Sequence, residues 1–471
     1  MDRLPLSPEE FHRLASRVVD LATRYLQDLR QMPTFPSTSA AATEAVFERP
    51  LPEGGMGAAA FEDLEWVLSL SRPCGPGFFG YVLGSGEPVA AVGDLLASVL
   101  NQNVTAWRSG PAAVTIERVV VRWLAEAIGC PEFTGSLTGG GSAANLMGLA
   151  MAREARAPSN THGSPAGTVY ASAEAHMSIA KAAALLGVGY DSVRTIAVDE
   201  ALRMVPEALD RAIRTDLDAG RRPIAVVATA GTVSTGSIDP MDALAEVAKR
   251  HGLWLHVDGA YGALAALALP DSFPGLDRAD SISIDPHKWL YQPLDCGCLL
   301  YREREAARAA FSHTGDYAKA LSSDPQESFA FFEESVELSR RFRALKIWLS
   351  LRYHGLEAFR EAIRGDLALA QRLAAGVDAQ PALQRLAPVA LSAVCFRHRG
   401  HGIDREDDLD ALNLRILQRI VRRGRVYLSN ASVRGRFALR ACIVNHRSTA
   451  EDVDAVVTET LAAAEDVLRE P

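Results

Sequence analysis

The chain has 471 residues, of which 48% are hydrophobic and 23% are charged, and its formal net charge is −9. This length and composition allow a large buried core and more than one domain. The mild acidic balance, without basic runs, argues against nucleic acid or an anionic membrane as a partner.

Residues 1–80 are expected to form a helical arm. Apolar residues recur at helical spacing from Phe11 to Leu29, and a link rich in Pro, Thr, Ser and Ala follows at 32–43. An arm of this kind cannot bury its own apolar face, so we expect it to pack on the partner subunit of a homodimer.

Residues 81–355 are expected to form a large domain in which strands alternate with helices. Such alternation predicts a mostly parallel sheet with right-handed crossovers, and hence an α/β fold. The expected strands are 168–175, 193–198, 224–230, 253–258, 281–285 and 296–302. Residues 356–471 are expected to form a smaller α+β domain, in which long helices flank strands at 425–429 and 437–444.

Cysteine usage and the N-terminal sequence bear on the compartment. Six cysteines in so long a chain do not make a disulfide framework, so a reducing compartment, the cytoplasm, is expected. Acidic residues near the start argue against a signal peptide, and no run approaches about 18 apolar residues. Cys296 and Cys298 alternate within a strand-like segment and have no second pair or His cluster, so no metal is expected.

A glycine-rich turn is the first candidate site along the chain. Gly139, Gly140 and Gly141 precede Ser142 and an apolar helix. Unhindered backbone N–H groups at a helix N-terminus form an anion site, here suited to a phosphate.

Three further candidates follow in chain order. His176 stands where a strand gives way to a Ser-bearing helix, and a neutral imidazole can stack on a flat ring or bind a carboxylate. Asp258 ends a short apolar strand, where a buried carboxylate needs a cationic partner. Lys288, one of only five lysines, follows the strand end at Asp285-Pro286, and an amine that must lose its proton has to be lysine. Asp258 and His176, each taken alone, are more readily explained by structural roles, whereas Lys288 at a strand end among hydrophobic residues favours a functional role.

The segment Asp-Pro-His-Lys-Trp-Leu at 285–290 resembles the pyridoxal-phosphate lysine motif of the group II amino-acid decarboxylases. This family includes the aromatic-L-amino-acid, glutamate and histidine decarboxylases. Residues 256–261 resemble its His-Val-Asp-Ala-Ala-Tyr, with a departure at Gly259, and residues 138–145 resemble its Thr-Ser-Gly-Gly-Ser-Glu-Ala-Asn. Segments 338–348 and 436–449 are also similar, so the resemblance covers nearly the whole chain.

The resemblance implies a fold type I pyridoxal-phosphate enzyme that works as a homodimer with its active sites at the subunit interface. It assigns Lys288 to the Schiff base, Asp258 to the ring nitrogen and His176 to the ring face. The implied cofactor contacts are Gly141, Ser142, His176, Thr232, Asp258, Ala260, Asp285, His287 and Lys288.

The implied reaction is decarboxylation of an L-amino acid, with an aromatic side chain favoured. Phe78, Phe79, Tyr81 and Trp107 match the family's aromatic pocket wall, and Gly355 leaves room for a large side chain. A general transaminase is disfavoured, because no arginine motif for the α-carboxylate is evident.

The proton donor to the product carbon decides between two enzyme hypotheses. The aromatic branch carries a tyrosine on a mobile loop nine residues before its Arg-Arg-Phe-Arg segment, and counting back from Arg340 gives Phe331. The family's aldehyde synthases, which decarboxylate and then deaminate oxidatively with O₂, carry phenylalanine there. Tyr317 is the alternative donor. A third hypothesis, a catalytically idle homologue that acts as a binding protein, is disfavoured by the intact Lys288 and Asp258.

Overall fold

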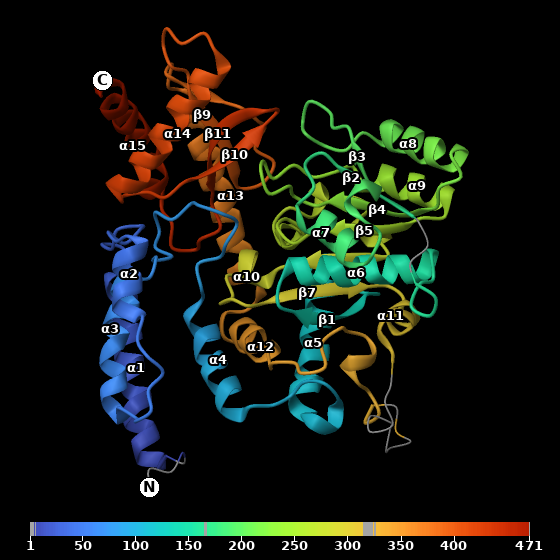
Figure 1. Cartoon of the computed structure of the whole chain (residues 1–471), viewed down its shortest axis with the longest axis horizontal. Coiled ribbons are helices and arrows are strands. Elements are labelled where there is room, and N and C mark those ends of the chain that lie inside the picture. The colour runs from blue at the N-terminus through green and yellow to red at the C-terminus, as the bar shows by residue number, and fades with distance from the viewer. Residues whose placement is uncertain (1–3, 5, 164–166, 314–323, 325, 471) are drawn as a thin grey trace.

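The computed structural model describes the chain except for residues 1–3, 5, 164–166, 314–323, 325 and 471. An N-terminal arm is followed by a domain built on a seven-stranded sheet and then by one built on a four-stranded sheet (Figure 1). Among the described residues, no helix is long and apolar enough to cross a membrane.

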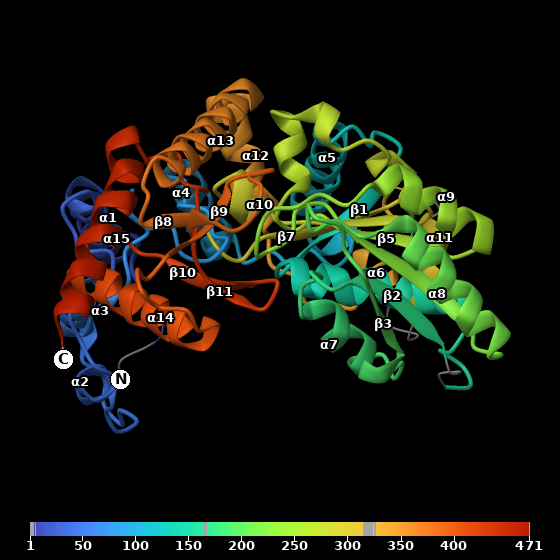
Figure 2. The same ribbon diagram turned by 90° about the horizontal axis from the view of Figure 1, so that it is seen from above.

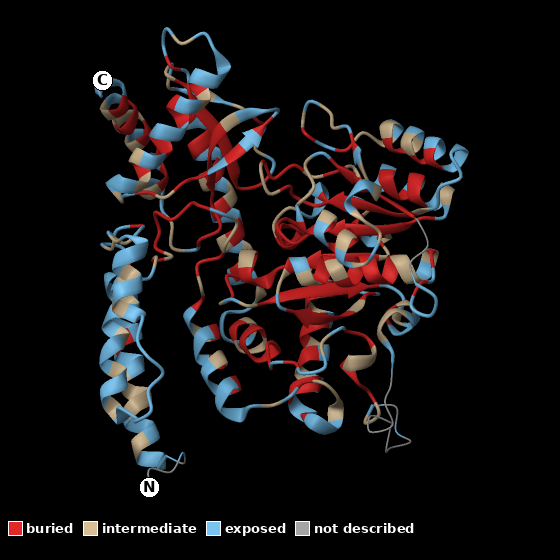
Figure 3. Cartoon of the chain, in the orientation of Figure 1, coloured by how far each residue is buried: buried red, intermediate tan, exposed pale blue. Residues whose placement is uncertain are grey.

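The arm contains helices α1 (Pro8–Asp28), α2 (Ala40–Phe47) and α3 (Leu64–Leu70). Helix α1 begins after Ser7, whose hydroxyl accepts a hydrogen bond from the backbone N–H of Glu10. Of the 21 residues of α1, only Leu21 is buried, and α2 and α3 contain no buried residue (Figure 3). The packing of the arm on a partner subunit stays a prediction.

The large sheet has the strand order β1-β7-β6-β5-β4-β2-β3. Strands β2 to β6 pair in parallel, whereas β7 runs antiparallel to both of its neighbours, so the sheet is mostly parallel as predicted. The strands are β1 (Thr134–Thr138), β2 (Thr168–Ser172), β3 (Val193–Ile196), β4 (Pro223–Thr229), β5 (Trp254–Asp258), β6 (Ser281–Ile284) and β7 (Gly297–Tyr301). Strand β1 was not predicted, because its Thr-Gly-Ser-Leu-Thr lacks a β-branched run and only its pairing with β7 makes it a strand.

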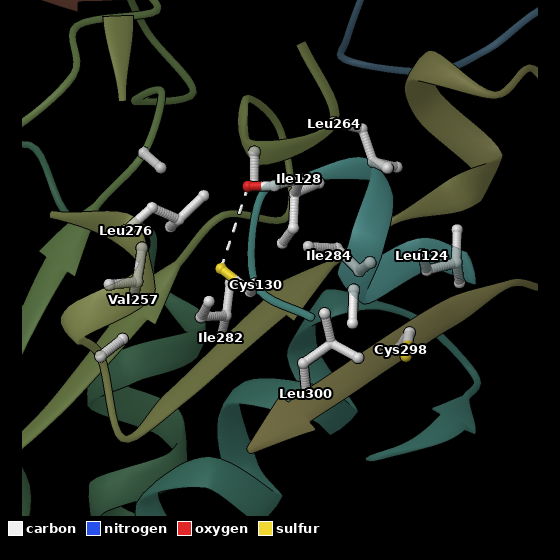
Figure 4. Packing of buried hydrophobic residues seen from close by; sticks show 14 of the residues in the cluster. Leu124, Ile128, Cys130, Val257, Leu264, Leu276, Ile282, Ile284, Cys298 and Leu300 are labelled. Atoms are coloured by element: carbon white, nitrogen blue, oxygen red, sulfur yellow. Dashed lines mark hydrogen bonds between the residues drawn. The ribbon is translucent and has the colours of Figure 1, made fainter. Parts of the chain in front are cut away.

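Alternate side chains of the strands enter two hydrophobic layers, one on each face of the large sheet. One face is covered by α6 (Gly141–Arg156), α7 (Ser178–Leu185) and α11 (Arg304–Phe311). The other is covered by α5 (Pro111–Ala127), α8 (Pro206–Asp218), α9 (Met241–His251) and α12 (Ala344–His354), with α4 (Pro88–Leu100) packed on α12. On this second face, Val257, Ile282 and Leu300 of the sheet meet Leu124 and Ile128 at the end of α5 (Figure 4). The strand ends are thereby held rigidly between two layers.

The small domain has an antiparallel sheet in the order β10-β11-β9-β8, covered by helices (Figure 2). Its strands are β8 (Leu383–Arg385), β9 (Ala393–His398), β10 (Ser429–Val433) and β11 (Arg436–Cys442), and its helices are α13 (Leu356–Asp378), α14 (Glu406–Arg423) and α15 (Ala450–Arg469). The prediction of two strands here was wrong: there are four, and β10 begins where the predicted 425–429 segment ends. The two-residue turn at Arg434 and Gly435, both with positive φ, fixes the β10–β11 register. The predicted domain boundaries near residues 80 and 355 remain predictions.

A buried ion pair ties α5 to the segment before α12 and to the strand β1. Arg340 and Glu117 pair with both side chains fully buried. Arg340 also donates to the carbonyls of Leu137 and Val104, each at 2.8 Å, and Glu117 accepts from the Leu137 N–H at 2.9 Å. Because Leu137 is two residues before the glycine turn, this pair fixes the base of that turn.

We expect Arg340→Leu to lower the free energy of unfolding by about 3–5 kcal/mol, because it leaves the Glu117 carboxylate buried without its cation. Replacing both partners in E117L/R340L should recover part of that loss. Urea unfolding followed by circular dichroism measures both effects. A single variant as stable as the wild type would show that Glu117 does not depend on Arg340.

Candidate active site

A cavity of about 450 Å³ opens at the C-terminal ends of the parallel strands, where α/β proteins bind their ligands. Asp258 ends β5, Lys288 follows β6, and His176 lies in the connection between β2 and α7. The glycine turn after β1 completes the wall. Residues predicted separately from four parts of the sequence therefore meet in one place.

Lys288 reaches the cavity from α10 (Pro286–Trp289), a single helical turn that begins directly after β6. Its Nζ lies 3.0 Å from Oδ2 of Asp285, and both side chains are largely buried. His287 on the same turn also lines the cavity, and its Nδ1 bonds the carbonyl of Cys296. Burial lowers the pKa of His287, which favours the neutral imidazole.

The Asp258 carboxylate is buried and is held by three donors. Its Oδ2 accepts from Nδ2 of Asn145 at 2.9 Å. Its Oδ1 accepts from the Ser283 hydroxyl at 3.1 Å and the Ala260 N–H at 3.2 Å. These bonds orient the carboxylate and satisfy part of its charge, and a cation on the cavity side would satisfy the rest.

His176 lies on the cavity wall beside the start of α7. Its Nδ1 lies 2.8 Å from the Ser178 hydroxyl and accepts from the Ser178 N–H at 3.3 Å. Burial lowers the pKa of His176, and the nearby Asp258 opposes that effect. A neutral ring held in this way can lie on the face of a flat ligand.

The glycine turn brings helix α6 close to the other site residues. Helix α6 begins at Gly141, so its first N–H groups lack partners within the helix. A Cβ on Gly141 would come within 2.7 Å of the Ala260 Cβ and 3.0 Å of Oδ2 of Asp285. Gly140 has a φ of +135°, a conformation that disfavours other residues. Ser142 follows on the cavity wall.

These residues fit pyridoxal phosphate. Asp285 Oδ1 and Thr229 Oγ1 are buried at this cavity and lack a hydrogen-bond partner among the described residues, so the wall offers polar atoms to a ligand. Lys288 supplies an amine, Asp258 a carboxylate for a ring N–H, and the start of α6 an anion site. When bound, the cofactor supplies an electron sink for the bond between the substrate's Cα and its carboxylate.

One predicted cofactor contact lies elsewhere. Thr232 is fully buried, and its hydroxyl bonds Thr235 and the N–H of Ser237, so it does not line the cavity. Thr229 and Gly231 line it instead. The strand β4 ends at Thr229, and Gly231 and Val233 on either side of Thr232 line the cavity, so only the side chain of Thr232 is directed away from it.

None of the six residues predicted for the substrate pocket lines this cavity within the single chain. Phe79 lies in the core of the small domain. Phe78 and Tyr81 gather around Tyr427, with the Arg72 guanidinium 4.0 Å from the Phe78 ring centroid. Trp107 packs on the core of the large domain, and Gly355 stands between α12 and α13.

The prediction that Phe331 occupies a loop tip was wrong. Phe331 is fully buried, and the Arg340 guanidinium lies 4.2 Å from its ring centroid. Phe329 packs edge-on against the same ring. The backbone N–H of Phe331 also donates to Thr105. The alternative donor, Tyr317, lies outside the described residues.

Reasoning from the sequence missed Asn145, Ser283 and Thr229. Asn145 and Ser283 hold Asp258 through their side chains. Asn145 is four residues after Gly141 and therefore on the same face of α6, and Ser283 precedes Asp285 by two residues on the same face of its segment. Those spacings were the available signals.

Comparisons with known proteins agree with this geometry. The model of the pyridoxal-dependent decarboxylase conserved domain matches residues 66–399. The chain is 33% identical to the aromatic-L-amino-acid decarboxylase of Bacillus atrophaeus over 99% of this chain and 98% of that protein. The crystal structure of Oryza sativa TDC with PLP and tryptamine matches with a TM-score of 0.93 at 28% identity, over 99% of this chain and 100% of that one. Rhodiola rosea 4-hydroxyphenylacetaldehyde synthase matches with a TM-score of 0.88 at 29% identity, over 98% and 99% of the two chains. The chain belongs to the pyridoxal-dependent decarboxylase family, and it is a PLP-dependent amino-acid decarboxylase.

Proposed function

We propose that this enzyme converts an aromatic L-amino acid to the corresponding amine and CO₂. The observation that carries the proposal is the charge on the cavity wall. Among the described residues that line the cavity, Lys288 is the only lysine or arginine, and it is paired with Asp285. Glu337 on the same wall is paired with Arg343. An acidic substrate side chain would therefore find no free cation among the described lining residues. The relative from Bacillus atrophaeus, named for aromatic substrates, supports the same class.

The protein residues divide the work of such a reaction. Asp258 would accept a hydrogen bond from the ring nitrogen of bound pyridoxal phosphate, whose ring would supply the electron sink. His176 would orient the ligand, and Lys288 would hold the cofactor through its amine. Asp258 and Asp285 are buried and the Lys288 side chain is largely buried, so these charges act in a medium of lower polarity than water.

The alternative of aldehyde formation was based on Phe331 at a mobile loop. Phe331 is part of the core, so it no longer supports that alternative. We therefore propose the amine as the product, although one similar structure is an aldehyde synthase. The cytoplasm is proposed as the location, in keeping with six cysteines that are all free thiols.

We also propose a homodimer, supported by the two faces of α4. Small buried residues, Ala90, Gly93 and Ala97, face inward. Large apolar residues on the opposite side are 47–64% exposed: Val92, Leu95, Leu96, Val99 and Leu100. With the uncovered arm, this makes more exposed apolar surface than a monomer needs, and a second copy of the chain would cover it.

The substrate prediction is tested with a panel of L-amino acids. Purified holoenzyme should form amine and CO₂ from tryptophan, tyrosine or phenylalanine, and should leave glutamate and cysteine sulfinate unchanged. Mass spectrometry of the products under air, with peroxide and ammonia assays, separates amine from aldehyde. Lys288→Ala is the control that should abolish all product. Glutamate as the best substrate, or aldehyde with peroxide as the main product, would overturn the proposal.

We expect Asp258→Asn to lower kcat by about 10³-fold or more, because a charge-assisted hydrogen bond in a dry site is replaced by a neutral one. The fold should survive, since the Asn side chain can still accept from Asn145. Steady-state kinetics beside circular dichroism test both statements. Turnover near that of the wild type would mean that another group keeps the ring nitrogen protonated.

The dimer prediction is tested by Leu96→Asp, which places a charge in the exposed apolar face of α4. Burial of an unpaired carboxylate at the interface should weaken self-association by about 10-fold or more. Leu468→Asp, at a similarly exposed leucine on α15, is the matched control and should have no effect. Sedimentation equilibrium measures the association, and equal behaviour of the two variants would contradict the proposed interface.

A further inference from the structure

A continuous set of buried polar side chains runs behind Asp258 and ends at His176. Its members come from α6, α7, β5 and β6, and each lies within 3.0 Å of the next. In order they are Trp254, Ser281, His256, Asn145, Ser178 and His176. Because Asn145 in this set also donates to Asp258, the set joins two residues that line the cavity, and the direction of its hydrogen bonds bears on both.

The assignment of donors and acceptors in this set starts from the Asp258 carboxylate. An ionised carboxylate only accepts hydrogen bonds, so the amide nitrogen of Asn145 must face it, at 2.9 Å. The amide oxygen of Asn145 then faces Nε2 of His256, also at 2.9 Å. An oxygen acceptor requires a proton on that ring nitrogen, so His256 carries its proton on Nε2.

The far end of the set is compatible with this tautomer. The indole N–H of Trp254 can only donate, and it donates to the Ser281 hydroxyl at 2.8 Å. The Ser281 hydroxyl keeps its own proton, and with Nε2 of a neutral His256 protonated, Nδ1 accepts that proton at 2.8 Å. His256 thus accepts at Nδ1 and donates at Nε2, which is the neutral ring. Burial lowers the pKa of His256 to about 4, and Asp258 opposes that effect, so the ring stays neutral near pH 7.

The second amide hydrogen of Asn145 determines which nitrogen of His176 accepts a hydrogen bond. Asn145 Nδ2 donates to the Ser178 hydroxyl at 2.9 Å. The Ser178 hydroxyl proton then goes to Nδ1 of His176 at 2.8 Å, which already accepts from the Ser178 N–H. A neutral His176 therefore has its proton on Nε2, available to a group bound in the cavity.

The helix α6 is shaped to admit the His256 ring. A Cβ on Gly148 would come within 2.5 Å of Cε1 and 2.6 Å of Nδ1 of that ring. Gly148 lies in the middle of α6, where glycine weakens a helix. The absence of a side chain at Gly148 therefore leaves the space that the His256 ring fills.

We propose that Asn145 and His256 are positioning residues that together orient the Asp258 carboxylate and fix the Nε2–H tautomer of His176. His256 acts through Asn145, because its Nε2–H prevents the Asn145 amide from rotating. This inference rests on the cofactor being held at Asp258 and is independent of the substrate that the enzyme takes.

The test compares His256→Gln with His256→Met in the full-length protein. Both side chains are flexible and similar in size, but only glutamine retains a donor near the position of Nε2. We expect His256→Met to weaken the affinity of the apoprotein for pyridoxal phosphate by about 10-fold, and His256→Gln by about 3-fold or less, because one buried donor separates them. His256→Met should also shift the pH midpoint of the cofactor's absorption band in the reconstituted protein, whereas a change in packing alone would leave it in place.

A second measurement needs neither cofactor nor substrate. Ring ¹⁵N shifts of the labelled apoprotein, with the His256 signal assigned by its loss in His256→Met, should show the Nε2–H tautomer from pH 6 to pH 8. An Nδ1–H or charged ring would overturn the inference, as would equal effects of Gln and Met on cofactor affinity. Because neither readout uses an amino acid, failure of the proposed substrate class would leave both results unchanged.

Discussion

Asp258 stands at the end of β5, buried beneath the cavity, and its carboxylate is surrounded by donors from three elements. A carboxylate removed from water costs several kcal/mol unless hydrogen bonds and an opposite charge compensate it. Asn145, Ser283 and the Ala260 N–H compensate part of that cost. The remainder calls for a cation at the cavity, which a protonated pyridine ring supplies. The site therefore presents a buried carboxylate whose remaining charge a cationic ligand would compensate.

Small residues make this arrangement possible, because α6 has to approach the sheet closely. Gly141 leaves the space into which Ala260 and Asp285 project, and Gly148 leaves the space for the His256 ring. Gly297 of β7 is equally close to the backbone of Gly140. Any side chain at these positions would push the helix away from the strand ends and separate the glycine turn from Asp258 and Lys288. The glycines of the turn therefore have a role in packing, besides the anion binding predicted for them.

For Phe331, the number of residues from Arg340 did not predict its position in the fold. The count back from Arg340 treated the intervening residues as an extended loop, but the chain returns so that Phe331 lies beneath the very arginine from which it was counted. A buried guanidinium over an aromatic face is a favourable contact, and it draws the phenylalanine into the core. The same arginine holds Glu117 and the carbonyl of Leu137, so this region stabilises the base of the glycine turn.

The sequence alone determined the features that depend on local chemistry. Alternation of strands and helices predicted the mostly parallel sheet, strand ends followed by Asp, His or Lys predicted part of the cavity wall, and glycines before an apolar helix predicted an anion site. The predictions made from strand ends are correct because parallel strands end at the same edge of a sheet. Residues that follow those strands therefore lie close together. Tertiary structure alone decided which polar atoms reach Asp258, why Thr229 lines the cavity while Thr232 does not, and that β1, β8 and β9 are strands at all. Those outcomes depend on distances between elements far apart in the chain, and a one-dimensional pattern carries no such distances.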